Sequence, residues 1–412
     1  MSSFGTSTEY KYTANGELES TLETIKGKLF ETKNIYDPSN GNLAEIIYPS
    51  GYHVYNSYDK TGQIIAVGDG SKVLYQLIEE DAMGRERSVK WAPNSMNGGV
   101  ESTTSYTTCN EQVQQSATKL ISPIGGLPSY EVFYNIGVVL DPIRGNVIQR
   151  VDNVKGLTES FVYDDLDRLT EIKDFHGTRK MFMDYEANGN IKLKSDWGDY
   201  FYGNQPIQPN AVKRISGDCC ATRAACLEFD KCFAEQNIVY NAYNKPVSLM
   251  EGHYQMNTEC DVNGNRNYYE LYEYPNEIFG PTTIKEMDMN TYPDIKTHAS
   301  LQFGKGILKK EKYYVGLFEN IIDHSKSSNI EYNYVMGPNG IFGVQVHDVN
   351  TYADNFYYFQ YDFQGSIMAL IDENGNIVNE YSYNAWGKRR NPYNWEEVNI
   401  TYQPIQVNKF TG

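Results

Sequence analysis

The sequence has 412 residues, of which 40% are hydrophobic and 14% aromatic, with 35 Tyr against 17 Phe. This aromatic content excludes a disordered chain, because disordered segments lack the large apolar side chains that a core needs. The 53 acidic residues outnumber the 36 basic ones, and the resulting net charge of −17 opposes nucleic-acid binding.

A short unit recurs along the chain. It consists of Tyr or another apolar residue, then Asp or Asn, a turn that usually contains Gly, and another apolar residue. The clearest copies lie, in chain order, at residues 35–46, 57–67, 80–89, 162–172, 184–194, 239–249, 260–269, 360–370 and 382–390. Asp37, Asp59 and Asp81 are spaced by 22 residues, so the repeat period is close to that length.

Each unit predicts a β-hairpin. The Asp or Asn side chain opens a turn by accepting bonds from the downstream backbone, and Gly supplies a positive φ. The residues that follow alternate between apolar and polar, which is typical of a half-buried strand. One hairpin cannot bury its aromatic face alone, so the sequence predicts an all-β array of stacked antiparallel hairpins. We expect Gly62, Gly189, Gly264 and Gly375 to lie in hairpin turns, several of them with a positive φ.

The Cys residues concentrate in one interruption of the repeats, where residues 218–234 are the segment most typical of a helix. Cys219, Cys220, Cys226, Cys232 and Cys260 cluster, while Cys109 stands apart. Their spacing matches no C-x-x-C zinc pattern. Buried free thiols, one or two disulfides and a metal site all stay open for this cluster. A Cys nucleophile is not expected, because no His lies within the cluster.

The most specific pattern lies near the C-terminus. It comprises Asp362, Gly365, Ser366, Leu370, Asp372 and Gly375, followed by Tyr381, Tyr383 and Gly387. This pattern resembles the RHS repeat-associated core, and the Tyr-Asp units resemble the YD repeats of the RHS family. The segment 309–321 and the ending RRNPYNW…KFTG resemble the Bacteroidetes branch of that family. The resemblance covers nearly the whole chain.

The resemblance implies a curved β-sheet that spirals into a hollow shell, which in polymorphic toxins holds a C-terminal toxin. Related repeats occur in insecticidal toxin complexes and in teneurins. The implied divisions are YD/RHS repeats at 1–210, a Cys-rich helical insertion at 211–236, repeats at 237–305, and an RHS repeat-associated core at 306–412 that is incomplete at its C-terminus. We therefore expect a truncated shell without its payload.

Family cores end in Asp-Pro-x-Gly motifs whose aspartates release the toxin by an aspartyl-protease-like reaction. The segment 141–145 has one residue too many for that motif, so no protease role is assigned to it. The acidic turn with Asp164, Asp165 and Asp167, and the turns at 261–265 and 372–376, are interpreted as turn chemistry rather than as catalytic or calcium sites. No catalytic, cofactor-binding or metal residue is predicted.

One basic and aromatic cluster stands out, formed by Trp386, Lys388, Arg389, Arg390, Tyr393 and Trp395. Such a cluster is able to bind a glycan or a phosphate, but a turn anchored by packed aromatic side chains is the favoured interpretation.

The leading functional hypothesis is a non-enzymatic β-shell scaffold of an RHS-type toxin or surface protein, which surrounds or presents a C-terminal effector absent from this chain. A cell-surface adhesion or carbohydrate-binding module is the alternative, and an autoprocessing aspartyl protease is the third hypothesis. The expected partners are the effector cargo, a surface glycan or protein receptor, and further copies paired through exposed strand edges. Nucleic acid is not expected as a partner. We expect a secreted or surface location, although the sequence shows neither a signal peptide nor the ~18-residue apolar run of a membrane span.

Overall fold

The computed structural model describes residues 6–92, 99–106, 113–121, 129–203, 209–216, 236–241, 243–261, 263–274, 306–362 and 364–396. The regular secondary structure of these residues is entirely β. The fold is therefore all-β, as the hairpin repeats predict.

The strands of the N-terminal half are β1 (Ser7–Tyr12), β2 (Leu18–Ile25), β3 (Lys28–Tyr36), β4 (Leu43–Ile47), β5 (His53–Tyr58), β6 (Ile64–Gly68), β7 (Val73–Glu80), β8 (Glu86–Trp91), β9 (Val100–Tyr106), β10 (Val113–Ile121), β11 (Ser129–Leu140), β12 (Val147–Asp152), β13 (Leu157–Tyr163), β14 (Leu169–Asp174), β15 (Arg179–Tyr185), β16 (Ile191–Lys194), β17 (Gly198–Tyr202) and β18 (Val212–Ser216).

The strands of the C-terminal half are β19 (Gln236–Tyr240), β20 (Pro246–Glu251), β21 (Tyr254–Cys260), β22 (Arg266–Glu273), β23 (Ile307–Val315), β24 (Phe318–Asp323), β25 (Ser328–Gly337), β26 (Gly340–Asp348), β27 (Ala353–Tyr361), β28 (Ile367–Asp372), β29 (Ile377–Glu380), β30 (Ser382–Tyr383) and β31 (Arg389–Arg390).

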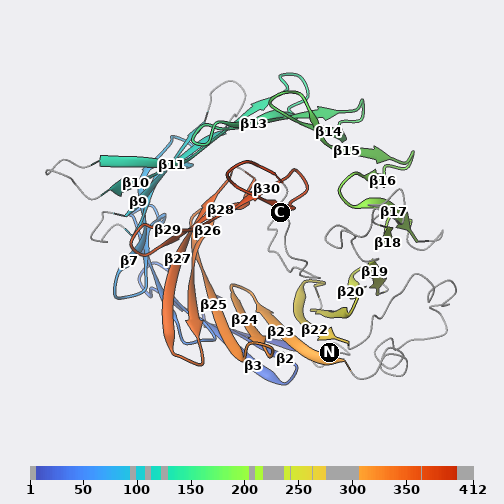
Figure 1. Cartoon of the computed structure of the whole chain (residues 1–412). Coiled ribbons are helices and arrows are strands. Elements are labelled where there is room, and N and C mark those ends of the chain that lie inside the picture. The colour runs from blue at the N-terminus through green and yellow to red at the C-terminus, as the bar shows by residue number, and fades with distance from the viewer. Residues whose placement is uncertain are drawn as a thin grey trace.

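Strands β1 to β29 form one sheet of 29 strands, and β30 and β31 form a separate pair. Each strand of the large sheet pairs antiparallel with the next one along the chain, as β1 does with β2 and β28 with β29. The described turns that follow odd-numbered strands therefore lie at the same end of the strands, along one rim of the sheet. The predicted antiparallel hairpin array is confirmed, and its sheet curves into a ring (Figure 1).

The chemistry of the repeat explains how each hairpin is held. At Asp164, Oδ1 accepts the backbone N–H groups of Leu166 and Arg168, both at 3.0 Å. The preceding Tyr163 sits at a register shift, and its hydroxyl donates to the carbonyl oxygen of Val147 at 2.8 Å. Asp thus shapes its own turn, while Tyr ties the hairpin to the start of an earlier strand.

The same tyrosine bond recurs elsewhere in the array. The hydroxyl of Tyr58 donates to Leu43 at 2.8 Å, and that of Tyr185 donates to Leu169 at 2.7 Å. The four predicted turn glycines all have positive φ, with values of 86° at Gly62, 91° at Gly189, 80° at Gly264 and 80° at Gly375. This part of the turn prediction is confirmed.

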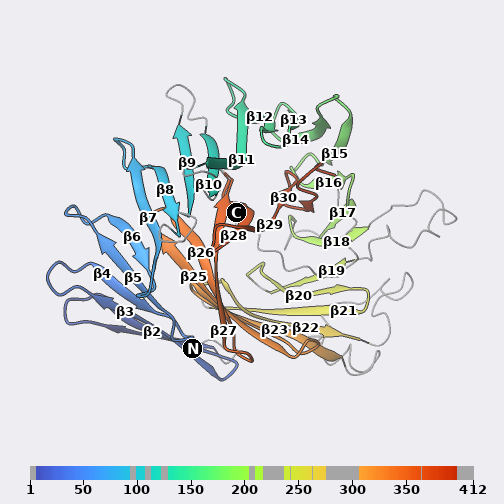
Figure 2. The ribbon, with the colours of Figure 1, turned by 60° about the vertical axis from the view of Figure 1, so that its left-hand side comes forward.

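The sheet overlaps itself face to face. Strands β2–β9 form an outer layer, and strands β23–β28 lie against its inner side (Figures 1 and 2). The largest hydrophobic cluster lies between these layers and joins Phe30 and Tyr75 of the outer one to Phe318, Phe342 and Phe356 of the inner one. The ring centroids of Tyr75 and Phe342 are 5.2 Å apart. The main core is thus built from distant repeats rather than within one.

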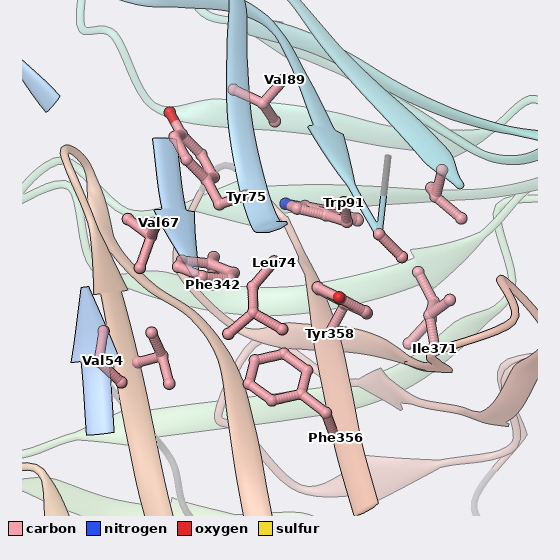
Figure 3. Packing of buried hydrophobic residues seen from close by; sticks show 14 of the residues in the cluster. Val54, Val67, Leu74, Tyr75, Val89, Trp91, Phe342, Phe356, Tyr358 and Ile371 are labelled. Carbon is pink, nitrogen blue, oxygen red and sulfur yellow. The ribbon is translucent and has the colours of Figure 1, made fainter. Parts of the chain in front are cut away.

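Figure 3 shows this interlayer core around Leu74, Trp91 and Tyr358, which are at most 5% exposed. Polar bonds join the same layers: the Tyr48 hydroxyl donates to the carbonyl oxygen of Tyr334 at 2.6 Å. Each fully buried large apolar side chain contributes about 1.5–3 kcal/mol. Overlap therefore supplies the second layer that a single sheet needs.

The predicted divisions at 1–210, 211–236, 237–305 and 306–412 stay predictions. The helix expected at residues 218–234 and the five residues Cys109, Cys219, Cys220, Cys226 and Cys232 lie outside the described part of the chain. Cys260 is described, and it is a half-buried free thiol.

Candidate functional site

The candidate site is a C-terminal segment that turns into the inside of the curved sheet. Residues 381–396, here called the inner segment, follow β29 and contain the β30–β31 hairpin. In Figure 1 this hairpin lies inside the ring rather than along its wall. Figure 2 shows it between the β28–β29 end of the inner layer and the strands β15–β16 across the ring.

The inner segment uses the same turn chemistry as the repeats, with Asn in place of Asp. Asn384 Oδ1 accepts the backbone N–H groups of Trp386 at 2.9 Å and Lys388 at 3.0 Å. Gly387 completes this turn with a φ of 77°. The turn sends the chain back, so that Ser382 and Tyr383 pair with Arg390 and Arg389.

A buried charge cluster, formed by Arg150, Glu159 and Arg390, fastens the inner segment to β12 and β13. Arg390 donates from Nη1 to Glu159 Oε2 at 2.6 Å and from Nη2 to Oε1 at 2.8 Å. Arg150 donates from Nε to the same Oε1 at 2.7 Å. The side chains are 10%, 5% and 7% exposed in the order Arg150, Glu159, Arg390. One carboxylate therefore serves two guanidinium groups in the interior.

Further contacts complete the surroundings of the two guanidinium groups. Arg150 Nη2 donates to the carbonyl oxygen of Tyr383 at 2.8 Å, and Arg390 Nε donates to Ser382 Oγ at 3.0 Å. The Trp395 ring lies over both cations, with guanidinium carbons 4.4 Å from its centroid for Arg390 and 5.5 Å for Arg150. Desolvated cation–π contacts of this kind are worth up to about 2 kcal/mol.

The electrostatics of the cluster follow from burial and pairing. Burial alone would raise the pKa of Glu159, but Arg150 and Arg390 outweigh it and hold that pKa below its ordinary value. Burial lowers the pKa of Arg390, and Glu159 opposes this shift. Loss of Glu159 would leave two guanidinium groups without their anion in the interior, and breaking a buried ion pair in this way typically costs about 3–5 kcal/mol.

Two weaker anchors hold other parts of the inner segment. Lys388 lies 3.7 Å from Asp196 Oδ2, and its ammonium group is 5.9 Å from the centroid of Trp197. Lys155, which follows β12, lies 3.3 Å from Glu380 and 5.3 Å from the ring of Tyr393. Cations and aromatic rings thus alternate along the whole contact.

The sequence singled out six residues of this segment: Trp386, Lys388, Arg389, Arg390, Tyr393 and Trp395. The structure brings them together and engages them within the protein, in the manner of the anchored turn favoured from the sequence. Arg389 lies over the ring of Tyr381, with its guanidinium carbon 4.7 Å from the centroid. The wall residues Arg150, Glu159 and Asp196 were not singled out, because the first two resemble ordinary solvent-facing charges on strands and the third resembles an ordinary charge in a turn.

The other clusters considered in the sequence have structural partners. Asp164 caps its own turn, and bonds from the Arg168 backbone N–H hold its pKa below the ordinary value. Asp167 receives a bond from Arg144 at 2.9 Å. Asp261 and Asp372 accept backbone N–H groups in the turns considered for calcium. Within the described ranges no group of three His, Cys, Asp or Glu residues is placed to hold a metal.

A cavity of about 630 Å³ lies between the two layers. Its walls include Glu86 of β8 and Asp362, which follows β27. Burial raises the pKa of both carboxyl groups. Glu86 accepts a bond from the Tyr75 hydroxyl at 2.5 Å, and Asp362 Oδ1 accepts backbone N–H groups in its turn. Both acids therefore have structural roles.

The described part of the chain contains no helix with the length and apolar character needed to cross a bilayer. Neither a protein-family model nor a curated protein sequence matches the chain.

Solved structures do match the fold. The crystal structure of TcdB2–TccC3 aligns with a TM-score of 0.63 at 12% identity, and that of TcdB2–TccC3–Cdc42 with 0.64 at 13%. The crystal structure of TcdB2–TccC3–TEV aligns with 0.63 at 13% identity. The alignments cover 97–98% of this chain but only 21% of the solved chains. The chain therefore spans about a fifth of their length and shares the fold of that portion.

Proposed function

We propose that the protein is a non-enzymatic β-shell scaffold of an RHS-type toxin or surface protein, which surrounds or presents a C-terminal effector outside the cell that makes it. The observation that carries the proposal is the direction of the chain. After 29 strands of wall, the inner segment leaves the sheet and is fastened on the inside of the curve by Arg150, Glu159 and Arg390. A polypeptide that continues from the inner segment would therefore begin on the inside of the ring (Figure 1).

The inner face of the wall supports the same proposal. On β25–β27, the side opposite the interlayer core carries an aromatic cluster that includes Tyr332, Tyr334, Tyr357, Phe359 and Tyr361. The rings of Tyr334 and Phe359 lie 6.4 Å apart, as do those of Tyr332 and Tyr334. Tyr334 and Phe359 are buried within this cluster, whereas Tyr332, Tyr357 and Tyr361 are half-buried and keep part of their rings accessible. Partly accessible tyrosines present apolar surface together with hydroxyl groups, which suits contact with a polypeptide of mixed polarity.

The fold likeness adds context. The matching structures are those of TcdB2–TccC3, and nearly all of this chain aligns with a fifth of each solved chain. The absence of enzymatic activity is proposed because two of the acidic residues considered for catalysis have structural partners: Asp164 caps its own turn, and Asp167 pairs with Arg144. Catalytic carboxylate pairs instead need environments that drive their pKa values apart.

Photo-crosslinking tests this function. A short segment carrying a photo-reactive residue is appended after Gly412, and the same segment is placed before Met1 as the control. We expect the C-terminal probe to crosslink to peptides of β25–β27 and β12–β13, whose inner faces line the ring. Crosslinks confined to outer-face residues such as Lys33, at the same yield as the N-terminal probe, would reject the scaffold.

Adhesion is a second candidate function, favoured by one observation. Four turns that follow odd-numbered strands, and therefore lie along one rim of the sheet, carry an exposed apolar side chain. These side chains are Met83, Ile143, Leu166 and Tyr243, which are 79%, 92%, 71% and 85% exposed. Exposed apolar tips on loops are typical of protein-binding surfaces. Replacing all four by Ser should abolish binding to a receptor-bearing cell surface if adhesion is the function, and should leave the C-terminal crosslinks unchanged.

A further inference from the structure

We propose that Arg150, Glu159 and Arg390 form an acid-release latch, in which protonation of Glu159 frees the inner segment while the strand array stays folded. The proposal rests on the proposed function for its meaning, because the freed segment is the one from which an enclosed effector would continue. The latch adds acid as the condition that frees the inner segment. The contacts that form the latch involve only residues of this chain, so they do not depend on a cargo.

The stoichiometry of the cluster makes Glu159 the decisive member. Both of its carboxylate oxygens accept bonds from Arg390, and Oε1 also accepts from Arg150. Two buried cations therefore share one anion. When that anion is neutralised, two guanidinium groups are left side by side in a poorly solvated place, where their repulsion is strong. A single proton thus changes the contact from attractive to repulsive.

The carboxylates on the strands next to Glu159 are already bonded to groups outside the charge cluster. Asp174 of β14 is the register partner of Glu159, but it caps its own turn and lies 3.4 Å from Lys180. Asp152 of β12 accepts backbone N–H groups from the turn that follows it and lies 3.9 Å from Lys155.

The other elements packed against the cluster contribute three further carboxyl groups. Glu380 pairs with Lys155, and Asp196 lies beside Lys194 and Lys388. Asp362 feels the charge of Arg150, yet its Oδ1 is occupied by its own turn. Among the described residues, Glu159 is the carboxylate that accepts hydrogen bonds from Arg390, so it is the direct anion of the latch.

The sign of the pH effect follows from the cluster. The pKa of Glu159 is lowered in the folded protein, so its contribution is fully present above the ordinary Glu value of about 4.3. The contribution is lost as the pH falls through the lowered folded value. The latch therefore stays closed in neutral and mildly acidic solution and opens only in stronger acid.

The strand array should respond to acid less sharply than the inner segment. Turn aspartates such as Asp59 and Asp164 are accessible to solvent and each acts on its own turn, and the interlayer core that holds β2–β9 to β23–β28 is built of hydrophobic side chains. Protonation of one turn weakens one hairpin, whereas protonation of Glu159 disrupts the main anchor of the inner segment. Release of the segment should therefore precede unfolding of the sheet.

The inner segment offers a direct optical readout. Of the four Trp residues, Trp386 and Trp395 belong to the segment and Trp197 lies beside Lys388, whereas Trp91 belongs to the interlayer core. Tryptophan fluorescence therefore follows the latch, and far-ultraviolet circular dichroism follows the strands. In an acid titration of the full chain, we expect the fluorescence change at a higher pH than the loss of strand signal. A single coincident transition would overturn the proposal.

Variants test the latch at neutral pH. Glu159→Gln imitates the protonated state, and the matched control Glu171→Gln removes a carboxylate from an exposed ion pair with Lys173 and Arg179. We expect Glu159→Gln to raise the rate of proteolytic cleavage within residues 381–396 by roughly 100-fold or more. The control should leave that rate unchanged. Equal rates in the two variants would overturn the latch.

A triple apolar variant separates the latch from general acid damage. Arg150→Met, Glu159→Leu and Arg390→Met together remove every charge of the cluster while keeping similar volume. We expect the segment of this variant to stay docked by fluorescence at a pH where the parent protein has released it. Release at the same pH as the parent would contradict the role of Glu159. Failure of the C-terminal crosslinks alone would instead reject the effector scaffold and leave the latch standing.

Discussion

Phe318→Ala should destabilise the protein by about 3–5 kcal/mol, the usual cost of truncating a fully buried Phe. Phe318 lies on β24 and is 1% exposed. Its ring centroid is 5.8 Å from that of Phe30 on β3, in the other layer. The truncation therefore removes apolar contacts both within β23–β25 and across the overlap. The cost should appear as a lower midpoint in chemical denaturation followed by circular dichroism.

A matched control variant tests whether the cost depends on burial, and a double-mutant cycle tests whether Phe30 and Phe318 interact across the two layers. Phe175 lies in a turn and is 71% exposed, so Phe175→Ala should change the free energy of unfolding by less than about 0.5 kcal/mol. Phe30→Ala combined with Phe318→Ala should show a coupling energy of about 0.5–3 kcal/mol, since the rings touch. Equal effects of Phe318→Ala and Phe175→Ala, or a coupling of zero, would refute the two-layer overlap.

Three further outcomes are expected. Gly189→Ala should cost about 1–2 kcal/mol in thermal or chemical unfolding, because Gly189 has a φ of 91°, whereas Gly137→Ala, at a strand position with room for a methyl group, should cost nothing. Tyr163→Phe should cost about 0.5–1.5 kcal/mol through its lost hydrogen bond, and Tyr243→Phe at an 85% exposed turn tip should be neutral. Stability should fall with pH below about 4, because the pKa of turn aspartates such as Asp164 is lowered by folding; stability constant down to pH 2 would contradict this reasoning.

The hairpins were predictable because their chemistry is local. Asp164 bonds to residues two and four positions further on, and Gly189 needs its positive φ for the turn in which it stands. A repeat read from the sequence already contains both features. The fold class follows from them, and the likeness to the TcdB2–TccC3 fold agrees with the curved sheet that the resemblance to the RHS family implies. Membership of the RHS family itself stays a prediction.

The overlap was not predictable by the same reasoning. Period-2 alternation indicates that Phe30 and Phe318 each face one side of a sheet, but not that they face each other. That pairing depends on how far each repeat bends the sheet, summed over the whole array. A small change in curvature per hairpin would place a different strand opposite β3.

Of the three latch residues, only Arg390 was singled out from the sequence. Arg390 drew attention because it belongs to a dense run of cations and aromatic rings. Glu159 and Arg150 lie in TES and QRV, which read as half-exposed strand positions. A weak signal existed at Glu159, which is the one charged residue of β13 and shares a face of that strand with Leu157 and Phe161. Without knowledge of what lies opposite, such a charge is expected to face water.

The placement of the inner segment follows from the shape of the sheet. Where β2–β9 meet β23–β28, each layer covers the other, and apolar side chains suffice to hold them. Strands β12–β17 lie across the ring from this overlap, and the inner segment reaches them there (Figure 1). A short segment buries too little apolar area to bind firmly by packing alone. Its attachment through Arg150, Glu159 and Arg390 concentrates the free energy of docking in three side chains, so docking can be undone at one point without disturbing the wall.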